Sequence, residues 1–243
     1  MVHVKNDLIQ WIRDWFEQNG KGCNGVVGIS GGKDSTVVAA LLVEALGADR
    51  VIGVLMPNGE QADIEDSRAV VKHLGIRSYE IDIKESVDGV LAQMVRAGIE
   101  ITDQTSINLP PRIRMSTLYA VSLSNNGRVA NTCNLSEDYI GYSTRYGDSA
   151  GDFAPLGSLT VQEVIQLGLL LGLPEYLVKK TPSDGLCGQS DEDKIGMRYE
   201  TLDRYIRTGE CEDLTIKEKI EKMHRANRFK LEPIPFFHYD GKL

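Results

Sequence analysis

The sequence predicts an α/β fold in which an open, mainly parallel sheet carries helices on both of its faces. Short apolar runs alternate with helical segments of ten or more residues, which is the pattern of repeated βαβ units. A glycine-rich turn directly follows the first apolar run, at the sheet edge where such folds bind ligands. These two observations carry the prediction of the fold class.

The first half of the chain supplies the expected sheet. Residues 5–18 carry apolar side chains at helical spacing, and residues 36–46 repeat this pattern after the glycine turn. The apolar run 51–55 is short enough to be a strand. The other elements expected in this half are helices at 63–74, 85–96 and 112–124, and strands at 25–29, 78–83 and 128–132.

The pattern changes after residue 144. The segment 146–152 is rich in turn-forming residues. Residues 181–190 are polar and contain glycine, so we expect a mobile loop there. No linker divides the chain, and one domain over residues 1–243 is expected. The helices expected in this half cover 160–171, 174–179, 191–207 and 216–226.

Composition argues against several functions. The net charge of −8 argues against broad nucleic-acid binding, so an anionic ligand needs a local cluster of cations. No apolar run is long enough to cross a membrane and the N-terminus lacks a signal-peptide core, so a cytoplasmic location is expected. The four cysteines show no C-x-x-C spacing, which favours buried or incidental thiols over a zinc site.

The turn at residues 30–35 reads Ser-Gly-Gly-Lys-Asp-Ser. Its backbone N–H groups and the positive end of the following helix converge on one point, which suits a phosphate. Ser30 and Ser35 add hydroxyl donors, and Lys33 adds positive charge. Asp34 would repel phosphates unless a cation lay between them, so it is a candidate magnesium ligand. The turn is neither a Walker A nor a G-x-G-x-x-G motif, and an ordinary Gly-Ser turn is the alternative.

Further motifs follow in order at residues 108–115, 132–137, 144–148, 152–156, 180–186 and 190–192, with Lys230 and Pro233 near the end. The first turn matches the S-G-G-x-D-S loop of the N-type ATP pyrophosphatases. With the Y-G-D loop and the later K-x-P-S-x-x-L segment, the set resembles the ammonia-dependent NAD synthetases over nearly the whole chain. The resemblance implies the Rossmann-like fold of the adenine nucleotide alpha hydrolases.

The resemblance also implies a reaction. The carboxylate of nicotinic acid adenine dinucleotide (deamido-NAD) attacks the α-phosphorus of ATP and releases pyrophosphate. Ammonia then attacks the adenylated carbonyl, giving NAD and AMP. Mg²⁺ is the implied cofactor, ATP the co-substrate and a homodimer the implied assembly. No glutaminase domain is expected in 243 residues, so ammonia is the expected nitrogen donor.

The resemblance assigns residues to the nucleotide and the metal ion. It implies catalytic roles for Ser30, Asp34 and Ser35, and a Mg²⁺ site at Asp34 and Glu137. These two carboxylates follow different strands of the expected parallel sheet, so they are expected to meet at one sheet edge. Glu137 could instead be a helix N-terminal carboxylate that is favoured by the helix dipole. The residues implied to bind ATP are Gly28, Ile29, Ser30, Gly31, Gly32, Lys33, Asp34, Ser35, Gln61, Thr132, Val161 and Ser183.

The resemblance assigns a second set to deamido-NAD, namely Arg112, Arg145, Asp152, Phe229 and Lys230. Arginine forks suit the phosphates of this substrate, and an aspartate can accept hydrogen bonds from a ribose or an amide. The alternatives are a solvated helix face for Arg112 and its neighbour Arg114, a surface position for Arg145, and a turn for Asp152.

Three positions depart from the family pattern. Val161 stands where the family commonly has a lysine that contacts ATP phosphates, a charge that Lys33, Lys179 or Lys180 could replace. Phe229 stands in place of a histidine. Two prolines at residues 110–111 replace Lys-Ala and are expected to shift the start of the next helix. The alternative functions are another N-type ATP pyrophosphatase with a different acceptor, and a non-catalytic nucleotide-binding module.

Overall fold

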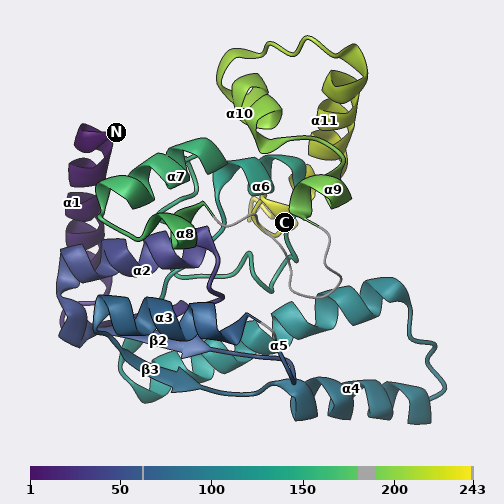
Figure 1. Cartoon of the computed structure of the whole chain (residues 1–243). Helices are drawn as coiled ribbons and strands as arrows, with labels where there is room; N and C mark the ends of the chain where they lie inside the picture. The colour runs from purple at the N-terminus through teal and green to yellow at the C-terminus, as the bar shows by residue number, and fades with distance from the viewer. Residues whose placement is uncertain (62, 180–189, 242–243) are drawn as a thin grey trace.

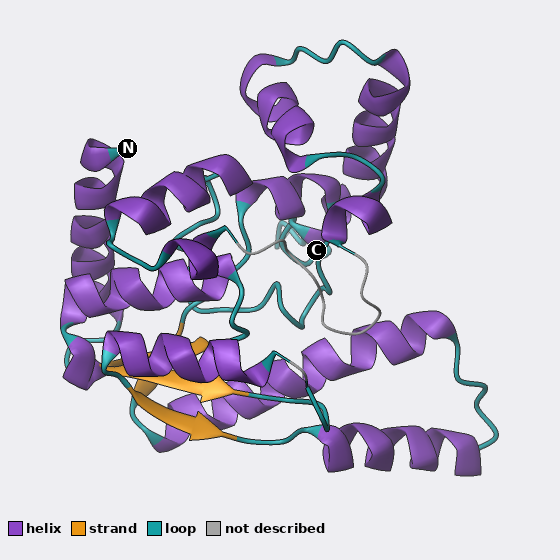
Figure 2. Cartoon of the chain, in the orientation of Figure 1, coloured by secondary structure: helices purple, strands orange, loops and turns teal. Residues whose placement is uncertain are grey.

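The computed structural model describes residues 1–61, 63–179 and 190–241. Its centre is a parallel sheet with the strand order β3-β2-β1-β4 (Figure 2). The fold class predicted from the sequence is confirmed. The strands are β1 (Asn24–Gly28), β2 (Val51–Leu55), β3 (Arg77–Glu80) and β4 (Gly127–Val129).

Helices cover both faces of this sheet because alternate strand residues point to opposite sides. On one face, Val27 and Leu55 join the main apolar core with α1 (Val2–Asn19) and α2 (Lys33–Leu46). On the other face, Val26, Ile52 and Val54 pack against Leu118 and Val121 of α5 (Asp103–Ser124). The short element η1 (Ala48–Arg50) and the helices α3 (Ile64–Leu74) and α4 (Lys84–Arg96) complete this half.

The second half forms a helical layer with an apolar cluster of its own (Figure 1). α10 and α11 stand together at the end of the molecule opposite α4. Among the described residues, no helix is long and apolar enough to cross a membrane. The elements are α6 (Leu135–Ile140), α7 (Val161–Leu170), α8 (Glu175–Val178), α9 (Asp191–Ile195), α10 (Tyr199–Thr208), α11 (Leu214–Asn227) and η2 (Arg228–Lys230).

The predicted start of the helix at residue 112 was wrong. α5 begins at Asp103, where the side chain of Thr102 accepts a hydrogen bond from the N–H of Thr105 (3.2 Å). Pro110 and Pro111 lie inside the helix. Each proline removes one backbone donor, but this 22-residue helix continues through both positions.

Other boundaries also differ from the prediction. The strand predicted at 78–83 is β3, which ends at Glu80. The helix predicted at 191–207 is two helices, because the chain turns at Gly196 with φ at 65°, a left-handed conformation that ends α9. β4 ends at Val129 rather than at residue 132. Beyond it, Ala130 makes an isolated parallel bridge to Phe153, so this stretch leaves the regular sheet.

Candidate active site

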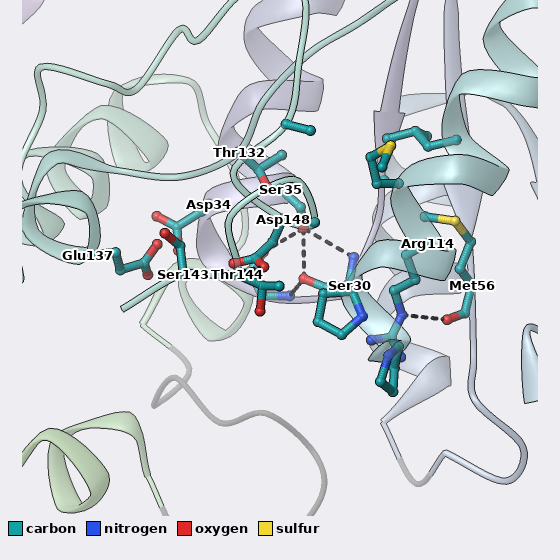
Figure 3. Close-up of a pocket in the computed structure, with 18 of the residues that line it drawn as sticks. Ser30, Asp34, Ser35, Met56, Arg114, Thr132, Glu137, Ser143, Thr144 and Asp148 are labelled. Carbon is teal, nitrogen blue, oxygen red and sulfur yellow. Dashed lines mark hydrogen bonds between the residues drawn. The ribbon is translucent and has the colours of Figure 1, made fainter. Parts of the chain in front are cut away.

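A pocket of about 690 Å³ opens at the carboxyl ends of the strands. Its walls come from the turn after β1, from residues 56–61 after β2, from residues 129–132 at the end of β4, and from α5 and α6 (Figure 3). The strand order reverses between β1 and β4, and open parallel sheets bind ligands at such a reversal. The position agrees with the ligand edge predicted from the sequence.

Serine hydroxyls hold the glycine turn after β1 in shape. The N–H of Ser30 donates to Ser35 Oγ at 3.2 Å, and the N–H of Gly32 donates to Ser30 Oγ at 3.2 Å. Gly31 adopts φ of 77°, and a Cβ there would lie 2.9 Å from the backbone nitrogen of Ser67. The turn therefore needs glycine at this position, both for its backbone angle and for the close approach of α3.

Two carboxylates lie side by side next to this turn (Figure 3). Asp34 is the second residue of α2, and Glu137 lies in the first turn of α6. The two oxygens of Asp34 each accept one hydrogen bond, from Asn134 Nδ2 at 3.0 Å and from Lys33 Nζ at 2.8 Å. The sequence placed these carboxylates at one sheet edge, and the fold brings them together.

Asn134 links the two carboxylates. Its side chain is fully buried, and its Oδ1 accepts the N–H of Glu137 at 3.1 Å while its Nδ2 donates to Asp34. The residue is thus both the N-cap of α6 and a support for Asp34. Sequence reasoning gave it no role, although an asparagine followed three residues later by glutamate is a helix-start signal.

Asp34 and Glu137 form an acidic corner of the pocket, and the electrostatics of this corner favour a bound cation. Burial, with the charge of Asp34 added, raises the pKa of Glu137 to about 8, although Lys33 opposes the shift. Burial alone would lower the pKa of Lys33, but the negative charges of Asp34 and Glu137 outweigh it and the net pKa is raised. This part of the pocket therefore holds more acidic groups than the buried Lys33 neutralises.

Two further cations, Arg114 and Lys230, line the pocket. Arg114 Nε donates to the carbonyl of Met56 at 3.0 Å, and burial lowers the pKa of Arg114. Lys230 Nζ donates to the carbonyls of Gly141 and Ser143 at 2.7 and 3.1 Å. Arg114 lines the pocket, so it is not part of a solvated helix face.

Asp148 lies between Arg114 and the carboxylates of Asp34 and Glu137 (Figure 3). Its Oδ1 accepts the N–H of Thr144 at 2.9 Å, and burial raises its pKa. The sequence analysis included Asp148 in a motif but gave it no role. Its position in the Y-G-D turn was the available signal.

The pocket brings together most of the residues implied to bind ATP and the metal. Gly31 belongs to the same turn without lining the pocket. Ser183 lies outside the described residues. The predicted residues on the pocket wall are Gly28, Ile29, Ser30, Gly32, Lys33, Asp34, Ser35, Gln61, Thr132, Glu137 and Lys230.

Val161 lies apart from this set. It is the first residue of α7 and is buried in the apolar cluster with Ile140, Tyr199 and Leu202. Its backbone N–H donates a hydrogen bond to Ser136 Oγ at 3.1 Å. The side chain is not on the pocket wall, so its predicted contact with ATP has no geometric support in this structure.

The remaining residues implied to bind deamido-NAD surround the pocket without lining it. The guanidinium carbon of Arg145 lies 5.4 Å from the ring centre of Phe229, and Arg112 Nε donates to the carbonyl of Arg145 at 3.3 Å. Asp152 accepts the N–H of Val129 at 2.7 Å and the hydroxyl of Tyr119 at 3.2 Å. These four residues, Arg112, Arg145, Asp152 and Phe229, thus form an outer ring next to Lys230 and Tyr119, both of which line the pocket.

The site combines three features: a glycine turn at the ligand-binding edge of the sheet, serine hydroxyls that hold this turn (the serine-braced turn), and a carboxylate at the start of the next helix. This combination is typical of nucleotide-binding α/β proteins of the ATP pyrophosphatase type. A family model described as NAD synthase matches residues 4–234. The chain belongs to the NAD synthase family.

Similar proteins agree with this membership. The chain is 36% identical to the NH(3)-dependent NAD(+) synthetase of Finegoldia magna, over 97% of this chain and 96% of that protein. It is 38% identical to that of Methanocaldococcus jannaschii, over 97% of this chain and 90% of the other. Two solved structures are similar at 30% identity. They are the NMN synthetase of Francisella tularensis (TM-score 0.89, 98% of both chains) and the NH3-dependent NAD synthetase of Campylobacter jejuni (TM-score 0.78, 97% of this chain and 98% of the other).

Proposed function

We propose that this protein is an ammonia-dependent ligase that converts deamido-NAD, ATP and ammonia into NAD, AMP and pyrophosphate. The observation that carries the proposal is the single pocket that joins the serine-braced turn to the Asp34 and Glu137 carboxylates. Family membership and the names of the relatives support the same reaction. The described residues of both halves line this pocket, which supports one catalytic unit over residues 1–243.

The turn binds the pyrophosphate end of ATP. Backbone N–H groups at the start of α2 and the positive helix end attract phosphate oxygens. Ser30 and Ser35 hold the turn in its binding shape through their mutual contact at 3.1 Å. Gln61 and Thr132, on neighbouring pocket walls, contact the rest of the nucleotide.

Asp34 and Glu137 are the residues that would hold Mg²⁺. The fit rests on the acidic corner, where two adjacent carboxylates face one buried lysine. Among the residues that the structure describes, no group of three His, Cys, Asp or Glu side chains is arranged to hold a metal alone. Two carboxylates suffice for Mg²⁺, which takes its other ligands from water and phosphates. The bound ion would neutralise the charge on the leaving pyrophosphate.

The protein must then bring two anions together and supply ammonia as a neutral nucleophile. Arg114 and Lys230 place positive charge on the pocket wall, where the substrate carboxylate and its phosphates need it. Ammonium must lose a proton before it can attack the adenylated carbonyl. Asp148 is a carboxylate on the pocket wall that accepts this proton, and desolvation raises its pKa above that of an ordinary aspartate.

The outer ring of Arg112, Arg145, Asp152 and Phe229 binds the far part of deamido-NAD. The pocket opens beside Lys230, and Phe229 presents a ring that is 54% exposed next to the Arg145 guanidinium. An exposed ring with an adjacent cation can stack on an adenine and pair with a phosphate.

Similarity to the Francisella tularensis NMN synthetase supports a second candidate function. The NMN synthetase structure superposes on this chain with a TM-score of 0.89, whereas the Campylobacter jejuni NAD synthetase gives 0.78 at the same sequence identity. The same chemistry would then act on a mononucleotide carboxylate, and the outer ring would have no adenosine to bind. The sequence relatives named as NAD synthetases favour the dinucleotide.

One assay tests both candidates. The protein is incubated with Mg²⁺, ATP and ammonium, and with either deamido-NAD or nicotinic acid mononucleotide, and AMP and amide product are measured. We expect equal amounts of AMP and NAD with the dinucleotide, and a higher kcat/KM for it than for the mononucleotide. Preference for the mononucleotide would establish the second candidate, and no AMP with either acceptor would refute the proposed reaction class.

A further inference from the structure

Lys33 is a buried cation whose position the proposed reaction does not explain. Its side chain is only 3% exposed, although it lies at the first residue of a helix beside an open pocket. Its Nζ lies 2.8 Å from Asp34 Oδ2 and 5.8 Å from the ring centre of Tyr199. Lysine is almost never buried to this extent unless a specific anion holds it.

The anion that holds Lys33 is a proposed metal ligand. Asp34 Oδ2 accepts the Lys33 ammonium, and Asp34 Oδ1 accepts the amide of Asn134. A divalent ion that approaches Asp34 therefore meets a carboxylate with a donor on each oxygen. Asn134 is fully buried and also caps α6, so it is the less mobile of the two donors.

We propose that Lys33 is a resident counter-cation, which holds the Asp34 carboxylate in the nucleotide-free enzyme, is displaced from it by a divalent ion and then pairs with nucleotide phosphates. This inference rests on the proposed function. The lysine side chain has rotatable bonds along its whole stem, so the ammonium can leave Asp34 without any movement of α2. Because Lys33 belongs to the phosphate-binding turn, the released ammonium has phosphate oxygens as its next partner.

The exchange has a thermodynamic consequence. Without nucleotide, a divalent ion must compete with an ammonium that is already buried beside Asp34, so the ion alone binds weakly. When nucleotide phosphates are present, they pair with the displaced Lys33 ammonium, so it competes less with the divalent ion for Asp34. Metal and nucleotide therefore bind cooperatively, and the coupling works equally in both directions.

The test measures Mn²⁺ binding to the nucleotide-free protein by electron paramagnetic resonance of the free ion. Lys33→Gln removes the charge and retains a polar side chain, and Lys33→Arg retains the charge. Lys84→Gln is the matched control, because Lys84 forms an equally short ion pair with Asp88 (2.8 Å) that is exposed on α4. We expect Lys33→Gln to bind Mn²⁺ about tenfold more tightly than wild type, and the other two variants to gain nothing.

A second measurement uses the unmodified protein, so it does not depend on the folding of a variant. Lysine acetylation is followed by mass spectrometry without metal and with saturating Mg²⁺, both in the absence of nucleotide. We expect Mg²⁺ to raise the reactivity of Lys33 and to leave Lys84 unchanged. Two results would overturn the inference without refuting the proposed metal site. One is a Lys33 that stays unreactive toward acetylation at saturating Mg²⁺, and the other is a Lys33→Gln variant whose Mn²⁺ affinity equals that of wild type. If no protein binds Mn²⁺ even with ATP present, the proposed metal site itself is refuted.

Discussion

At the scale of single residues, the site depends on contacts that connect its acidic groups to each other. Asn134 caps α6 and supports Asp34 with the same side chain, so the positions of both proposed metal ligands depend on it. Lys33 and Asn134 together occupy both oxygens of Asp34. The chemistry of the corner is thus set by residues that do not themselves bind the metal.

The two roles of Asn134 can be separated by substitution. Asn134→Ser keeps a good N-cap residue but removes the amide that supports Asp34, whereas Asn134→Ala removes both. We expect Asn134→Ala to lower the free energy of unfolding by about 1 kcal/mol more than Asn134→Ser. Both variants should lose affinity for Mg²⁺ and ATP to a similar extent. Full retention of this affinity in Asn134→Ser would contradict the proposed support of Asp34.

The raised pKa of Glu137 predicts how stability depends on pH without metal. The folded protein retains a proton on Glu137 up to a pKa of about 8, whereas the unfolded carboxyl loses it at its ordinary value of 4.5. Between these values the folded state binds more protons, so the free energy of unfolding falls as pH rises. We expect the Tm in chelator to fall less steeply for Glu137→Gln than for wild type between pH about 5 and about 8. Parallel slopes for the two proteins would show that Glu137 titrates normally.

Asp148 is predicted to take the proton from ammonium. Asp148→Asn should lower kcat by about 10²-fold or more at neutral pH, because general-base catalysis typically contributes this much. Raising the pH increases the fraction of free ammonia, so part of the loss should be recovered at alkaline pH. The measurement is kcat against pH at saturating ammonium. A loss that is the same at every pH would assign Asp148 a purely structural role.

At the scale of elements, the start of α7 is a part of the core and not of the pocket. Val161 begins this helix, and its side chain packs among residues of α6, α9 and α10. The sequence analysis noted that the family commonly has, at this position, a lysine that contacts ATP phosphates. In this structure a lysine side chain there would place its charge among apolar groups.

We therefore expect Val161→Lys to destabilise the protein by at least about 2 kcal/mol, as substitutions that bury an unpaired charge do. Val161→Met is the control, since methionine has a comparable length without the charge. Urea unfolding of the two variants gives the difference directly. Unchanged stability together with tighter ATP binding in Val161→Lys would mean that position 161 reaches the nucleotide after all.

At the scale of the whole molecule, the alternation of strands and helices could be predicted because its periodicity is local. The turn at residues 30–35 and the convergence of Asp34 and Glu137 followed from the same pattern, since parallel strands end at one edge. The continuation of α5 through Pro110 and Pro111 could not be predicted, because it depends on packing over 22 residues. The burial of Lys33 likewise depends on side chains from distant elements.

We propose that two copies of the chain associate through the surface of α4, the first half of α5 and the segment that joins them. These helices project together from the sheet (Figure 1), and Val95, Ile99 and Ile107 are each more than half exposed. Ile107 also lines the pocket, so a partner at this surface would lie next to the substrate.

Sedimentation should give the mass of a dimer for wild type and a monomer for the double variant Val95→Glu, Ile99→Glu. Leu123→Glu, at an exposed position near the other end of α5, is the control and should remain dimeric. A wild-type monomer at the concentrations used for activity would contradict the dimer.

The central claim is that the turn after β1 holds the phosphates of ATP, with a divalent ion between them and the two carboxylates. Its most direct test is the anomalous diffraction of Mn²⁺ in crystals grown with a non-hydrolysable ATP analogue. We predict a Mn²⁺ peak in contact with Asp34, Glu137 and phosphate oxygens that lie against residues 30–35. A nucleotide bound elsewhere, or Mn²⁺ remote from both carboxylates, would contradict the account.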